Sequence, residues 1–122
     1  APVSNVFEKS GLEVSTPGYL KGKSGATHTF DILGRIVFGG KEKIVVLDLA
    51  YASDSVDVSP VSTLMGKLVD TEAGHGILVA IPMLDRTAKN LAELYDIEIV
   101  EARTPKDAAG EIEKSLRKVL QT

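Results

Sequence analysis

Residues 27–52 read THTFDILGRIVFGGKEKIVVLDLAYA, and this stretch decides the fold of the chain. Two runs of β-branched and apolar residues, 27–38 and 43–52, lie on either side of the pair Gly39-Gly40. A glycine pair between two strand-like runs is a strong signal for a tight hairpin. The stretch therefore predicts two long antiparallel strands.

The part of the chain after this hairpin alternates helical and strand-like segments. Ser59-Pro60 is a good helix start, and residues 76–82 and 97–100 are short apolar strands. Asp85 caps a helix between these strands, and Thr104 begins the last helix. The helix that begins at Ser59-Pro60 has an apolar face with helical spacing, made of Val61, Leu64, Met65, Leu68 and Val69.

Three short segments precede the hairpin: a helix over 4–10, a strand over 12–16 and a loop rich in glycine and lysine over 17–26. The predicted order is α β β β α β α β α. An α/β fold, with a central mixed sheet that contains the N-terminal antiparallel hairpin and is flanked by helices, is the economical arrangement. The 122 residues form a single domain, 1–122, and the start at Ala1 fits a piece excised from a larger protein or a processed product.

The composition is that of an ordinary globular protein, with 43% hydrophobic and 25% charged residues. A formal charge of −3 gives no attraction for nucleic acid over the whole surface, so such a partner needs a local basic patch. The chain has no cysteine, which excludes disulfides and thiolate metal sites. It has no apolar run of about 18 residues and no secretion signal, so we expect a cytoplasmic protein without a membrane partner.

Two aspartates, Asp31 and Asp48, interrupt the apolar runs of the predicted hairpin. A carboxylate that is buried in a strand without a partner is costly, so two of them indicate a cation, a metal ion or a cleft. If the hairpin register brings their faces together, both carboxylates bind one hard divalent cation, which activates water and neutralises charge on a phosphate. The alternative is that each aspartate lies at an exposed edge or pairs with a nearby lysine.

The order of elements resembles the restriction-endonuclease fold of the PD-(D/E)XK nucleases, and within it the Mrr-type restriction enzymes and archaeal resolvase-like proteins. The resemblance extends over nearly the whole chain, chiefly through GATHTFDI at 25–32, IVVLDLA at 44–50 and GILVAIP at 76–82. It implies a hydrolase that cleaves DNA phosphodiesters with Mg²⁺ or Mn²⁺. It also matches Asp31 and Asp48 to the two acids that bind the metal.

The chain departs from that family at Ala50, where the motif has a lysine that positions the attacking water and offsets negative charge. In some members the helix after the motif strand supplies the lysine, and Lys67 lies in the matching helix. The resemblance therefore implies a catalytic set of Asp31, Asp48 and Lys67. Two alternatives stay open: Lys67 lies off the apolar stripe and is an ordinary solvated lysine, and the domain is an inactive module that binds protein or nucleic acid.

The segment GYLKGKS at 18–24 looks like a phosphate-binding P-loop, but it has three residues between its glycines instead of four and leads into a strand, so we predict no nucleotide site. Lys21 and Lys23 are either contacts for a nucleic-acid backbone or solvated lysines. His28 faces away from Asp31 along its strand, which favours a structural role. The aromatic residues form no interleaved basic-aromatic stretch, and this disfavours a platform that stacks single strands. A homodimer and a covalently linked domain are open as further partners.

Overall fold

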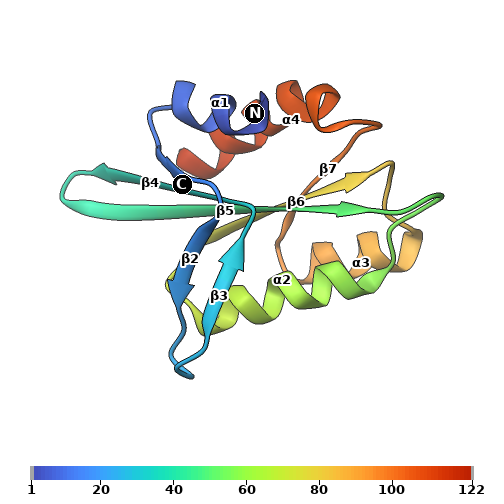
Figure 1. Cartoon of the computed structure of the whole chain (residues 1–122), viewed down its shortest axis with the longest axis horizontal. Coiled ribbons are helices and arrows are strands. Elements are labelled where there is room, and N and C mark those ends of the chain that lie inside the picture. Colours follow the sequence, from blue (N-terminus) through green and yellow to red (C-terminus); the bar gives the residue numbers. More distant parts are fainter. Residues whose placement is uncertain (1, 122) are drawn as a thin grey trace.

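The computed structural model describes residues 2–121, and Figure 1 shows the arrangement of its elements. The helices within this range are α1 (Pro2–Lys9), α2 (Val58–Asp70), α3 (Arg86–Leu94) and α4 (Pro105–Leu120). The strands are β1 (Glu13–Ser15), β2 (Gly18–Lys21), β3 (Thr27–Phe30), β4 (Ile32–Phe38), β5 (Lys41–Tyr51), β6 (His75–Ile81) and β7 (Glu98–Glu101). None of the helices within residues 2–121 has the length and hydropathy that a bilayer span requires.

A mixed sheet of five strands, in the order β1-β4-β5-β6-β7, forms the centre of the molecule. β1, β4 and β5 pair antiparallel, whereas β5, β6 and β7 pair parallel. Helices α1 and α4 cover one face of this sheet, and α2 and α3 cover the other (Figure 1). The predicted α/β fold, a mixed sheet with an N-terminal antiparallel hairpin and flanking helices, is confirmed.

Each face of the sheet has its own apolar core, because successive side chains of a strand point to opposite faces. In β5, Val46 and Ala50 belong to the core under α2 and α3, while Val45 and Leu47 belong to the core under α1 and α4. Most of the residues that were predicted to form the apolar face of α2 do pack in the core under α2 and α3. Val69 is the exception: its side chain is 63% exposed, because the helix turns this position to the rim of the apolar stripe.

The run 27–38, predicted as one strand, is broken at Asp31. β3 pairs with β2 in a separate two-stranded sheet, and β4 joins the central sheet. The prediction of a loop over 17–26 was therefore wrong for residues 18–21, which form β2. Gly18 is typical of a loop, but its role here is a close approach between strands: a side chain at Gly18 would collide with Leu33 of β4.

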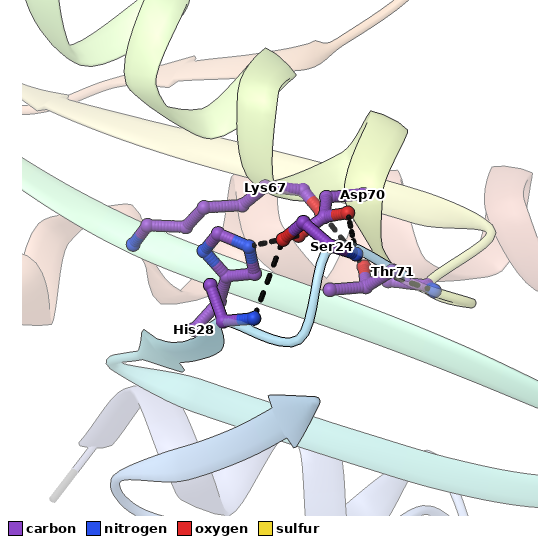
Figure 2. A network of polar contacts seen from close by, with 7 residues as sticks. Ser24, His28, Lys67, Asp70 and Thr71 are labelled. Atoms are coloured by element: carbon purple, nitrogen blue, oxygen red, sulfur yellow. Dashed lines mark hydrogen bonds and ion pairs between the residues drawn. The ribbon is translucent and has the colours of Figure 1, made fainter. Parts of the chain in front are cut away.

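The turn of the β2–β3 hairpin is bound to the C-terminal end of α2 by a cluster of Ser24, His28 and Asp70 (Figure 2). The Asp70 carboxylate accepts hydrogen bonds from the Ser24 backbone N–H at 2.8 Å and the Ser24 hydroxyl at 2.6 Å. His28 Nε2 lies 2.7 Å from Asp70 Oδ2, which gives His28 a structural contact. Gly22 lies so close to Asp70 that a side chain at Gly22 would collide with the carboxylate. The hairpin and α2 are thus held together.

These contacts change the acidity of Asp70. The Ser24 hydroxyl has the largest effect, followed by His28 and the Ser24 backbone N–H, and together they lower the pKa of Asp70 from 3.8 to about 2. Each of these hydrogen bonds stabilises the charged carboxylate. The ionised form of Asp70 is therefore the form that binds the hairpin to α2.

We expect the Ser24–His28–Asp70 cluster to make stability depend on pH on the acid side. Because the pKa of Asp70 is lower in the folded protein than in the unfolded chain, its contribution is complete above about pH 4 and is lost as the pH falls towards about 2. Asp70→Asn should lower the free energy of unfolding at neutral pH and flatten its decline in acid. Urea unfolding across this range measures the effect, with Asp54→Asn as the control at an exposed aspartate. Equal curves for Asp70→Asn and the wild type would contradict the assignment.

Candidate active site

The break between β3 and β4 places Asp31 beside Asp48 of β5. Ile32 pairs with Leu47, so the next position on each strand brings the two aspartates opposite each other. The backbone N–H of Asp31 donates to Asp48 Oδ1 at 2.9 Å, and the backbone N–H of Leu49 donates to Asp31 Oδ2 at 2.7 Å. The strands are therefore aligned in the register that a shared site for Asp31 and Asp48 requires.

Lys67 of α2 joins this pair. Its ammonium donates to Asp48 Oδ2 at 2.9 Å and to the Thr29 carbonyl at 2.6 Å, and it lies 5.0 Å from the centroid of the Phe30 ring. The side chains of Lys67 and Asp48 are only 19% and 15% exposed. Lys67 is therefore not the ordinary solvated lysine of the alternative interpretation, because carbonyl, carboxylate and ring together replace much of the water around the ammonium.

Two hydroxyl residues extend the site along α2. Ser59, Thr63 and Lys67 are spaced by four residues, which places them on one face of the helix. All three line a cleft of about 360 Å³ together with Thr29, Asp31 and Asp48. The sequence interpretation missed Ser59 and Thr63, and their spacing from Lys67 was the signal that pointed to them.

Ala50, the position where the resemblance led us to expect a lysine, lies in a closed environment. It is 7% exposed, belongs to the core under α2 and α3, and pairs with Ala80 of β6. By strand alternation Ala50 shares a face with Asp48, so a lysine there would place its stem among apolar side chains. The structure instead brings a positive charge to Asp48 from Lys67 on the helix.

The carboxylates of Asp31 and Asp48 carry oxygen atoms of the kind that hard divalent cations bind, although Asp48 Oδ1, Asp48 Oδ2 and Asp31 Oδ2 already accept hydrogen bonds from the protein. Mg²⁺ commonly binds proteins through about one or two carboxylates and keeps several waters. Within residues 2–121 no group of three or more His, Cys, Asp or Glu side chains is arranged to hold a metal ion. A cation at this cleft would have at most these two aspartates as acidic protein ligands.

The two hairpin lysines and a further titratable residue, His75, lie outside this cleft. Lys21 ends β2, and Lys23 lies in the hairpin turn; both are exposed. His75 begins β6 and lines a separate cavity of about 450 Å³, where burial, and then the nearby Lys43, lower the pKa of its imidazole. The structure therefore brings together Asp31, Asp48 and Lys67, and leaves both hairpin lysines on an adjoining surface.

Two solved structures share this fold. One is described as "Crystal Structure of Protein of Unknown Function AF1548"; it has a TM-score of 0.69 and 12% identity, over 95% of this chain and 63% of that one. The other, "MspJI Restriction Endonuclease in Complex with 27-mer Oligonucleotide", has a TM-score of 0.54 and 21% identity, over 98% of this chain and 26% of that one. At these identities the likeness concerns the fold, and the chain spans less than two thirds of either protein.

Family membership comes from the sequence itself. No curated protein matches the chain at a significant level. A family model, Mrr_cat, described as a restriction endonuclease, matches residues 2–104, which include the hairpin bend, β5 and α2. The matched range includes every residue that lines the cleft, and the family agrees with the observed fold. This chain therefore belongs to the Mrr_cat restriction endonuclease family.

Proposed function

We propose that this chain is a divalent-metal-dependent nuclease domain that cleaves phosphodiester bonds of DNA. The observation that carries the proposal is that Asp31 from the β3–β4 bend, Asp48 from β5 and Lys67 from α2 line one cleft. Membership of a restriction endonuclease family supports the reaction type. MspJI, which has the same fold, is solved with a 27-mer oligonucleotide, and this supports DNA as the substrate.

In this proposal Asp31 and Asp48 would hold Mg²⁺ or Mn²⁺, and such an ion would supply an activated water and neutralise charge on the phosphate. Lys67 is held by the Thr29 carbonyl and Asp48, so its ammonium would lie near a phosphate that is bound at Asp48. A positive charge that is already in place stabilises the negative charge that develops during phosphoryl transfer. Lys67 thereby takes the role of the motif lysine that Ala50 replaces.

The binding of DNA requires positive charge and donors around the cleft. Ser59 and Thr63 on α2 can donate to phosphate oxygens, and Lys21 and Lys23 can contact the backbone further along the strand. Because the whole chain has a formal charge of −3, we propose that a second copy or a covalently linked domain supplies further affinity. The cytoplasm is the compartment that this function fits.

A catalytically inactive module is the second candidate. Each aspartate already accepts a backbone hydrogen bond, and Lys67 already pairs with Asp48, so the three residues stabilise the bend without a metal. Such a module would bind protein or nucleic acid within a larger protein. The two candidates differ in one observable, which is metal-dependent cleavage.

The purified chain should cleave duplex, branched or single-stranded DNA with Mg²⁺ or Mn²⁺, and EDTA should stop the reaction. Asp48→Asn keeps the size of the side chain and an acceptor for Asp31, but it removes a metal-binding charge, so the rate should fall at least about 100-fold. Gel assays of labelled oligonucleotides measure this, and Asp54→Asn serves as the control. Failure to cut all three DNA forms would favour the inactive module.

Metal binding should also be visible without DNA. A cation that binds only the folded state stabilises it by about 2.7 kcal/mol when its concentration is about 100 times the dissociation constant. Mn²⁺ should therefore raise the melting temperature of the wild type and have much less effect on the double variant Asp31→Asn/Asp48→Asn. An equal rise in both proteins would place the bound metal elsewhere.

Replacement of Lys67 tests its proposed role in the reaction. Lys67→Met should lower kcat by about 100-fold, because a preorganised charge near the phosphate is lost, while KM changes little. Lys67→Arg should restore part of kcat, and Lys114→Met on the exposed face of α4 is the matched control. A normal kcat in Lys67→Met would show that Lys67 only pairs with Asp48 in the structure and takes no part in the reaction.

A further inference from the structure

The β2–β3 hairpin has one face directed to the protein and one directed to solvent. Leu20 packs against the core, Phe30 is fully buried, and His28 contacts Asp70. The opposite face, here called the outer face, is exposed at all of its positions, and the Tyr19 side chain is 59% exposed. The outer face consists of Tyr19, Lys21, Thr27 and Thr29.

The outer face leads directly to the cleft. Tyr19 pairs with Thr29 across the hairpin, and Thr29 lines the cleft beside Asp31. Residues that are directly opposite in an antiparallel pair have Cβ atoms about 5 Å apart. Lys21 pairs with Thr27, one step further from Asp31 along the same face. A chain-like ligand that leaves the cleft along the hairpin therefore meets Tyr19 first and Lys21 next.

The chemistry of this face suits a nucleic-acid strand. Residues 18–30 contain Lys21 and Lys23 and no acidic residue, although the whole chain has a formal charge of −3. A lysine that neutralises phosphates beside an aromatic ring that stacks on bases is the usual arrangement of single-strand binding surfaces. In sequence Tyr19 and Lys21 form no basic-aromatic stretch, but strand alternation places them on one face.

The hairpin is also held rigidly. Asp70 binds its turn through Ser24, and Lys67 binds its base through the Thr29 carbonyl. Both residues belong to α2, which also forms one wall of the cleft. A surface that is fixed before binding loses little conformational entropy when the ligand arrives. The outer face is therefore anchored through α2 beside the cleft that contains Asp31 and Asp48.

We propose that the outer face of the β2–β3 hairpin binds an unpaired DNA strand next to the cleft, with Tyr19 stacked on a base and Lys21 on a phosphate. This inference rests on the proposed function and specifies its substrate class, which is DNA with unpaired nucleotides beside the cleavage position. The exposed ring of Tyr19 favours unpaired over duplex DNA, because the faces of bases in a duplex are covered by their neighbours.

Fluorescence anisotropy with a labelled single-stranded oligonucleotide, and with the duplex of equal length, tests the proposal in EDTA, where no cleavage occurs. The single strand should bind more tightly than the duplex. Tyr19→Ser should weaken single-strand binding at least about fivefold, and Tyr19→Phe should retain it, since the ring provides the contact. Lys21→Gln should weaken binding and reduce the slope of log K against log salt concentration by about 0.7.

Lys114→Gln removes the same charge from α4, away from the hairpin, and should leave binding unchanged. Wild-type affinity in Tyr19→Ser, tighter binding of the duplex, or failure to bind the single strand would each overturn the proposal. Because the assay contains no metal, it is independent of catalysis. Loss of cleavage in Asp48→Asn with normal binding in Tyr19→Ser would leave the nuclease function intact and remove only the binding surface.

Discussion

Two hydrogen bonds between backbone N–H groups and the aspartates hold together both the fold and the candidate site. Asp31 donates to Asp48 at 2.9 Å, and Leu49 donates to Asp31 at 2.7 Å. At this point β3 turns away from β5 to pair with β2, so the ladder to β5 ends. Backbone N–H groups need acceptors wherever a ladder ends, and the carboxylates supply the acceptors that the bend removes. The same oxygens then line the cleft.

The elements that were predicted correctly have local signals. Gly39-Gly40 marks the hairpin, and Asp85 and Thr104 cap their helices by accepting from backbone N–H groups of the first turn. The break at Asp31 has no such signal, because β-branched and apolar residues lie on both sides of it and the change of strand partner depends on residues distant in sequence. β2 was missed for a related reason: its glycine allows close packing against Leu33, whereas glycine in isolation indicates a turn.

The site was predictable to the extent that it depends on alternation and register. The position of Asp31 beside Asp48 follows from the hairpin, and Lys67 came from the family resemblance. The contacts of Asp70 were not predictable, because Ser24 and His28 lie 46 and 42 residues away from it in sequence. From sequence alone, a polar residue on a helix is interpreted as solvent-exposed, because a partner that is distant in sequence cannot be identified.

If Lys67 supplies the charge that the family motif places on the strand, as we propose, then the position of that charge depends on α2. A lysine at position 50 would be placed by the sheet, whereas Lys67 is placed by α2 and depends on how that helix is held. Lys67 and Asp70 are three residues apart, on neighbouring positions of the helix surface, and they bind the base and the turn of the same hairpin. Each contact restricts rotation of α2 about its axis, which would otherwise move the Lys67 ammonium away from Asp48. The Ser24–His28–Asp70 cluster therefore contributes to the position of the positive charge in the cleft, although it lies outside the cleft itself.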